Sequence, residues 1–288
     1  TWSRAQGAAL SAPTARWALL FSSAFSATRE PRRRRLYADR SRYWLNSRDK
    51  QEDVAAYDAA VRKVCDTYAE APAIAARGGH VVSTDEKTGM QALERMFPTK
   101  TTKPGLIERR EFEYIRHGTQ CLIANFDVAK GRICAPSIGF TRTEADFAAH
   151  IAQTIDTDPD AEWVFVVDQL NTHMSPSLVR LVAERCGLDL DLGQVRRDGP
   201  LRNMKTRKAF LESESHRIRF VYTPRHCSWL NQIEIWFSIL ARRVLRRGSF
   251  TSTDDLRAQV LDFIEYFNTV LAKPFRWTYA GRPLQGAK

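Results

Sequence analysis

A short apolar run that ends in an acid sets the fold class of this chain. Residues Trp163 to Val167 are all hydrophobic, and Asp168 follows directly. An uninterrupted run of this length is typical of a strand buried on both faces of a sheet. Such a strand needs helices on both faces, so the run predicts an α/β architecture. A carboxylate at the end of a buried strand is costly unless it is paired or binds a ligand, which makes Asp168 a candidate functional residue.

The remaining apolar patterns predict strands and helices around this strand. Strands are expected at 80–85, 120–128, 132–138 and 217–222, and helices at 50–70, 143–155, 175–186, 231–247 and 254–268. Residues 86–118 look irregular, and residues 187–216 form a polar, basic segment. The order of strands and helices from residue 80 matches that of RNase H-like nuclease folds. We therefore predict an RNase H-like mixed sheet flanked by helices, with a basic insertion before the last strand.

Three acids fall at one edge of this predicted sheet. Asp85 and Asp168 each end a strand, and Glu234 lies in the first turn of the helix after the last strand. Ligands bind at this edge in open α/β sheets. Oxygen ligands suit magnesium or manganese, and two such ions can clamp a phosphodiester. From the residues alone, Asp85 could equally be a turn residue and Glu234 a helix-start acid, and other acids lie nearby: Glu86, Asp127 and Asp146.

His173 follows Asp168 by five positions. A histidine here could orient substrate or transfer a proton. The spacing alone favours a simpler interpretation, in which His173 is a loop residue that caps the next helix.

The chain is strongly basic. Its 44 Lys and Arg residues against 33 Asp and Glu give a formal charge of +11. This surplus favours a polyanionic partner, because each phosphate that Lys or Arg neutralises releases condensed counterions. Nucleic acid is the usual partner of this kind, and an anionic membrane surface would fit the charge too. The sequence has no apolar run long enough to span a bilayer. The candidate DNA-binding residues are Arg196, Arg197, Lys205, Arg207, Lys208, Arg242, Arg243, Arg246 and Arg247.

The number and spacing of the cysteines indicate the cellular compartment of the protein. The chain has 5 cysteines, an odd number, and no Cys-x-x-Cys pair. This pattern argues against a disulfide framework or a zinc site and predicts a protein of the reducing cytoplasm.

Several blocks of sequence resemble transposases of mariner-like bacterial insertion sequences, which are DDE superfamily endonucleases. The similarity covers roughly residues 42 to 285, and the block Ser-Trp-Leu-Asn-Gln-Ile-Glu at 228–234 is the most specific. The other blocks are Ser83 to Glu86, Tyr114 with Arg116 to Thr119, Val167 to His173, Thr223 to Cys227, and Lys273 to Trp277.

This resemblance implies metal-dependent DNA cleavage and strand transfer at the ends of an insertion sequence. It also implies a homodimer that acts on double-stranded DNA and not at a membrane. By motif position, Asp85, Asp168 and Glu234 are the acids that bind two magnesium or manganese ions. Asn231 and His173 are the supporting residues that the resemblance implies.

The chain departs from the family pattern in two ways. The stretch between Asp168 and Glu234 is longer than in the compact pattern, and the extra length is the basic segment 187–216. Paired helix-turn-helix units are not visible upstream. We expect residues 1–45 to be a basic arm or the remnant of an upstream DNA-binding region, and residues 46–288 to be the catalytic domain. Two alternatives stay open: a truncated, inactive DNA-binding remnant, or a related RNase H-like nuclease.

Overall fold

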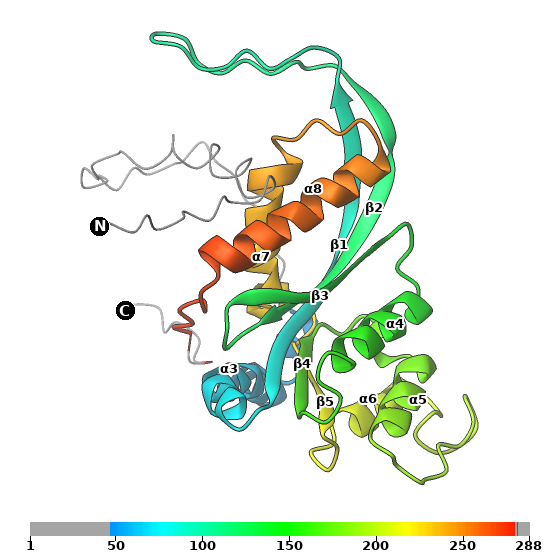
Figure 1. Cartoon of the computed structure of the whole chain (residues 1–288). Coiled ribbons are helices and arrows are strands. Elements are labelled where there is room, and N and C mark those ends of the chain that lie inside the picture. The colour runs from blue at the N-terminus through cyan, green and yellow to red at the C-terminus, as the bar shows by residue number, and fades with distance from the viewer. Residues whose placement is uncertain (1–46, 280, 282–288) are drawn as a thin grey trace, which may run out of the picture.

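The computed structural model describes residues 47–279 and 281, so the N-terminal arm expected over residues 1–45 lies outside it. The described residues form one sheet with the strand order β3-β2-β1-β4-β5 (Figure 1). The strands are β1 (His80–Arg95), β2 (Tyr114–Asp127), β3 (Arg132–Gly139), β4 (Trp163–Val167) and β5 (Ile218–Tyr222). β1, β2 and β3 pair antiparallel, whereas β4 and β5 run parallel to β1. The predicted fold class, an RNase H-like mixed sheet, is confirmed.

Helices cover both faces of the sheet. One face packs against α3 (Val54–Ala76), α7 (Ile233–Leu240) and α8 (Thr253–Tyr266), and the other against α4 (Glu144–Ile155), α5 (Pro176–Arg185) and α6 (Met204–Leu211). A short helix α2 (Arg48–Glu52) precedes α3, and the π-helical turns Ala241–Leu245 and Phe267–Leu271 extend α7 and α8. None of the helices in the described part of the chain is long and apolar enough to cross a membrane.

The apolar run of β4 divides its side chains between two cores. Val164 and Val166 belong to the cluster under α3, α7 and α8, whereas Trp163, Phe165 and Val167 belong to the cluster under α4 and α5. All five are buried. Successive side chains of a strand point to opposite faces, so a strand covered by helices on both sides must be apolar throughout.

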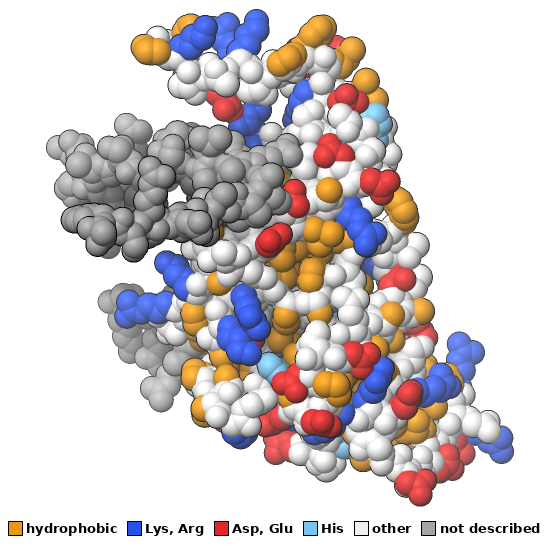
Figure 2. All heavy atoms as spheres, viewed as in Figure 1, with side chains coloured by type: hydrophobic (Ala, Val, Ile, Leu, Met, Phe, Trp, Pro, Cys, Tyr) orange, Lys and Arg blue, Asp and Glu red, His pale blue; other side chains and the backbone are white. Residues whose placement is uncertain are grey.

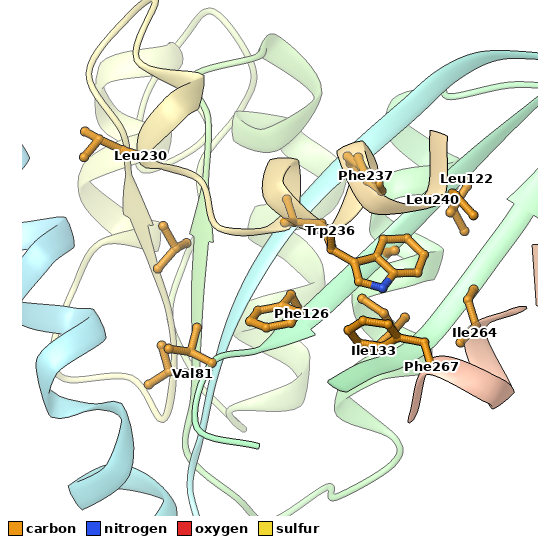
Figure 3. Packing of buried hydrophobic residues seen from close by; sticks show 14 of the residues in the cluster. Val81, Leu122, Phe126, Ile133, Leu230, Trp236, Phe237, Leu240, Ile264 and Phe267 are labelled. Carbon is orange, nitrogen blue, oxygen red and sulfur yellow. The ribbon is translucent and has the colours of Figure 1, made fainter. Parts of the chain in front are cut away.

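Packing of aromatic rings fixes α7 against the sheet. Trp236 and Phe237 of α7 are buried, and Figure 3 shows them between the helix and the strands. The ring of Trp236 meets that of Phe267 edge-on, with 6.0 Å between the ring centroids. Behind them, Phe126 of β2 stacks on Phe275 at 4.4 Å. Burial of each such side chain contributes about 1.5–3 kcal/mol, which holds the helix that carries Glu234 in place.

The expectation of an irregular segment over residues 86–118 is wrong at both ends. β1 continues to Arg95 and β2 begins at Tyr114, so the two strands form a long hairpin. Charged residues line these strand ends, and the register shifts between Lys87 and Met90, where Gly89 has a φ of 66°. This bulge breaks the two-residue period by which a strand is recognised in a sequence.

Residues 96–113 form the tip of this hairpin, which projects from the body of the molecule (Figure 1). Only isolated bridges, such as Lys100 with Arg109, join its two sides within the described structure. Basic and hydrophobic side chains gather on it (Figure 2). The exposed hydrophobic residues of the tip are Met96, Phe97, Leu106, Ile107 and Phe112.

The basic insertion at 187–216 is partly helical. It contains α6, which begins with a reciprocal cap between Asn203 and Thr206. The sequence did not predict this helix, because only Leu211 of α6 is buried and the apolar period is therefore weak.

Candidate active site

Two carboxylates lie side by side where β1 and β4 run together. Ser83 pairs with Val166 in the parallel ladder between these strands, and Asp85 and Asp168 follow two residues later on each. Asp85 is buried, whereas the side chain of Asp168 is 36% exposed. Burial and the nearby charge of Asp168 raise the pKa of Asp85 to about 7. Mutual repulsion of this kind is relieved when a cation binds between two acids.

His173 joins the second of these acids to a third carboxylate. Its Nδ1 atom lies 2.7 Å from Oδ1 of Asp168, and its Nε2 atom lies 3.2 Å from Oε1 of Glu86. The imidazole is completely buried and packs on the ring of Phe147. Burial disfavours the charged imidazole, but the two carboxylates outweigh burial and raise the pKa of His173 to about 10. His173 thus orients Asp168 from inside the protein.

The simpler interpretation of His173 as a helix cap is wrong. Ser175 caps α5, because its hydroxyl accepts a hydrogen bond from the backbone of Leu178. His173 belongs to a short 3-10 helix (Asn171–Met174) that precedes this cap.

The pKa of Asp168 responds to the same contact. Burial alone would favour the neutral acid, but the hydrogen bond and the charge of His173 hold the pKa of Asp168 below its usual value. The pair therefore contains one acid that ionises readily and one, Asp85, that resists ionisation. Different surroundings of this kind are common at functional sites.

Sequence reasoning placed Glu86 outside the set of site residues. The structure gives it a buried side chain, only 2% exposed, in contact with His173. β1 does not end at Asp85 but continues past it, which carries Glu86 into the protein. The signal that could have found it is a carboxylate inside a strand, because a buried acid needs a partner.

Asn231 links Asp85 to the segment that carries Glu234. Its amide donates to Oδ2 of Asp85 at 3.2 Å and to the carbonyl of Thr84 at 3.1 Å, and its side-chain oxygen accepts from the hydroxyl of Ser83. Asn231 is completely buried. The backbone carbonyl of Asn231 accepts from the backbone N–H of Glu234 at 3.1 Å, so one residue contacts both segments.

Glu234 itself is the second residue of α7 and is half-buried. Within residues 47–279 and 281, no three side chains of His, Cys, Asp or Glu are grouped so that they could hold a metal ion as they stand. The structure therefore brings Asp85 and Asp168 together and does not group Glu234 with them. The donors of the acid pair are oxygens, and their charges repel each other, which fits a hard divalent cation.

The candidate DNA-binding residues divide by exposure. Arg207 turns inward, where its guanidinium donates to the carbonyls of Met174 at 2.6 Å and Leu201 at 3.1 Å. Arg207 thus supports the basic insertion itself. Arg243 is half-buried. The exposed members are Arg196, Arg197, Lys205, Arg242, Arg246 and Arg247.

Lys208 lies near the end of β5. Its amino group is 5.3 Å from the centre of the Tyr222 ring, at the end of β5. Together with Gln169 and Arg225 it lines a cavity of about 340 Å³ between α3 and the loops that follow β4 and β5. Glu52 and Asp53 line the same cavity, so its charged lining is balanced, and Gln169 follows Asp168 directly in the chain.

Comparison with known families decides the class of protein. The model of a family described as DDE superfamily endonuclease matches residues 80–257, which is more than half of the chain. The chain belongs to this family. The match begins at the first residue of β1 and ends within α8, so Asp85, Asp168 and Glu234 all fall inside the DDE endonuclease region. Among curated proteins, no match to the chain was found.

Solved structures of a mariner transposase resemble this DDE endonuclease weakly. The Mos1 strand transfer complex is 11% identical over 84% of this chain, with a TM-score of 0.43. A pre-cleavage Mos1 transpososome is 10% identical over 86% of this chain, also with a TM-score of 0.43. A Mos1 mariner paired-end complex with Mn is 13% identical over 72% of this chain, with a TM-score of 0.28. The match covers 60% of the Mos1 chain in that complex. The present chain spans 59% and 63% of the first two Mos1 chains.

Proposed function

We propose that this chain is a mariner-like transposase that cleaves DNA and transfers strands at the ends of an insertion sequence, with magnesium or manganese as the cofactor. The observation that supports this most directly is the closeness of Asp85 and Asp168, which lie just beyond the parallel ladder of β1 and β4. The chain that carries them belongs to the DDE endonuclease family. Glu234, which follows Asn231 by less than one helical turn, is the third acid of the proposal.

Asp85, Asp168 and Glu234 would hold two divalent cations. Bound there, such ions activate the attacking oxygen and stabilise the leaving oxygen of a phosphodiester. The protein contributes position and charge. His173 keeps Asp168 ionised and oriented, and Asn231 holds a carboxylate oxygen of Asp85. Asp85, whose pKa is about 7, gives up its proton when a cation binds.

The basic surface supports duplex DNA as the substrate. The formal charge is +11, which favours a polyanionic partner. Exposed arginines such as Arg242 and Arg246 add sites for phosphate contacts. We propose that two copies of the chain act together on DNA, as pairing of two ends requires, and that they do so in the cytoplasm, where unpaired cysteines are usual.

Nicking of supercoiled plasmid by the purified chain tests this proposal. We expect nicking that requires Mg²⁺ or Mn²⁺ and that Asp168→Asn abolishes, while binding to duplex DNA is retained. Glu162→Gln is the matched control, because Glu162 precedes β4 whereas Asp168 follows it, at the opposite end of the same strand. Glu162 pairs there with Arg77 and Arg219, so this variant removes an acid without touching the site.

Two results would overturn the proposal. Equal nicking by the wild type and Asp168→Asn would mean that the acid pair is not the catalytic centre. DNA binding without any metal-dependent nicking by the wild type would identify the chain as an inactive DNA-binding remnant.

A further inference from the structure

The first turn of α7 has no side-chain cap from its own segment, where only the backbone carbonyls of Asn231 and Gln232 accept, from the N–H groups of Glu234 and Ile235. A helix begins with backbone N–H groups that have no acceptor within the helix, and a side chain just before the helix usually accepts from one of them. Gln232 precedes α7, and its side chain makes no such hydrogen bond. Because Glu234 lies in this turn, the groups that accept from these N–H groups also determine where Glu234 lies.

Ser83 of β1 supplies one acceptor. Its hydroxyl oxygen accepts from the backbone N–H of Ile233, the first residue of α7, at 2.9 Å. The same hydroxyl donates its hydrogen to the side-chain oxygen of Asn231. Ser83 is completely buried and lies two residues before Asp85 on the same strand. β1 therefore carries both Asp85 and the residue that caps α7, the helix in which Glu234 lies.

Tyr68 of α3 supplies a second side-chain acceptor. Its hydroxyl oxygen accepts from the backbone N–H of Gln232 at 3.3 Å and donates to the carbonyl of Leu230 at 2.9 Å. The ring is 4% exposed and meets the edge of Trp277, with 5.1 Å between the ring centroids. A ring enclosed in this way cannot leave the turn without unpacking its neighbours.

We propose that Ser83 and Tyr68 are positioning residues: they cap α7 from two other elements and so fix the segment 230–234, with Glu234, against β1. The consequence for metal binding rests on the proposed function, whereas the capping does not. A helix capped only by side chains of its own segment could rotate with that segment. α7 is instead held by Ser83 of β1, the strand that carries Asp85, and by Tyr68 of α3.

Three single substitutions test this in the full chain. Ser83→Ala and Tyr68→Phe each delete one hydroxyl and keep the rest of the side chain. Thr67→Val is the matched control, because Thr67 neighbours Tyr68 on α3 and its hydroxyl bonds only within that helix, to the carbonyl of Lys63 at 2.7 Å. Two quantities are measured: amide hydrogen exchange of peptides that cover residues 230–236, and binding of Mn²⁺ to each protein by the electron paramagnetic resonance signal of the free ion.

We expect exchange in residues 230–236 to rise at least fivefold in Ser83→Ala and Tyr68→Phe, and the Mn²⁺ concentration at half-saturation to rise about tenfold, with neither change in Thr67→Val. Exchange equal to that of Thr67→Val would overturn the capping. Faster exchange with unchanged Mn²⁺ binding would overturn the positioning role. If the wild type binds no Mn²⁺, the proposed function has failed, and hydrogen exchange alone decides the capping.

Discussion

The amide nitrogen of Asn231 lies 3.2 Å from Oδ2 of Asp85, across 146 positions of the chain. Replacement of Asn231 by alanine leaves three buried groups without this partner: the Asp85 carboxylate, the Thr84 carbonyl and the Ser83 hydroxyl. Unmet buried polar groups cost about 1–3 kcal/mol. That cost applies to each group, so we expect Asn231→Ala to lower the free energy of unfolding in urea by at least about 3 kcal/mol. The exposed Asn171 provides the comparison, and equal losses in Asn171→Ala and Asn231→Ala would contradict the assignment.

The bridge between Glu86 and Asp168 through His173 predicts strong coupling. His173→Gln removes the positively charged imidazole and leaves the buried Glu86 carboxylate without a charged partner. This lowers the free energy of unfolding by about 3–5 kcal/mol. Glu86→Gln in the same protein should recover a large part of this loss, because the uncompensated charge is then gone. A double-mutant cycle of urea unfolding measures the coupling. If the losses of the two single variants simply add, Glu86 and His173 do not form the pair described.

His150 predicts a loss of stability in acid. It is completely buried in α4, with Nδ1 2.8 Å from the hydroxyl of Ser137, and burial lowers the pKa of His150 to about 3. The unfolded chain takes up the proton near pH 6.5, so the neutral imidazole stabilises the fold above that pH. This stability is lost as the pH falls from about 6.5 toward 3, at up to about 1.4 kcal/mol per pH unit.

Urea unfolding of the wild type and His150→Gln at pH 7, 6 and 5 checks this. The difference between the two proteins should shrink as the pH falls, because only the wild type contains the imidazole. Carboxylates titrate in both proteins and cancel in the comparison. A difference that stays constant from pH 7 to pH 5 would show that His150 is not buried in its neutral form.

Two glycines with the same backbone conformation should tolerate alanine very differently. Gly131 has a φ of 67° and Gly89 a φ of 66°. A Cβ atom at Gly131 would lie 1.9 Å from the backbone of Lys273, whereas nothing lies within 4 Å of one at Gly89. We expect Gly89→Ala to cost about 1 kcal/mol, the usual penalty of this conformation. Gly131→Ala should cost more, because the segment at Lys273 must move.

Limited trypsin proteolysis after the exposed Arg276 measures that movement, because Pro274 prevents cleavage after Lys273. Faster cleavage is expected in Gly131→Ala than in Gly89→Ala or the wild type. Equal rates in all three would mean that the C-terminal segment does not pack on the turn between β2 and β3.

The sequence predicts the central part of the fold well and the contacts of the site poorly. The apolar run of β4 leaves little choice of structure, and Asp168 at its end follows from the same pattern. The turn before β3 is equally local, since Gly131 adopts a positive φ there. These features depend on neighbours in the chain, which a pattern of residue types can show.

The missed features depend on residues far apart. The extension of β1 past Asp85 comes from pairing with β2, and charged residues such as Lys87 conceal it. The partner that gives Glu86 its place in the site, His173, is 87 positions away in the chain. The caps of α7 are supplied by Ser83 and Tyr68, which precede it by 150 and 164 positions in their hydrogen bonds. No local spacing contains this information.

The distance between these partners has a consequence for the order of events during synthesis. Asp85 is made early, but β4 pairs with β1 only after residue 167 has emerged, and Asn231 and α7 follow still later. Contacts of such long range form slowly, because closing a long loop costs entropy before any contact repays it. A growing chain therefore carries its first acid for many residues before the second and third arrive. Under the proposed function, a growing chain that has not yet extended past α7 therefore has no assembled site for DNA cleavage.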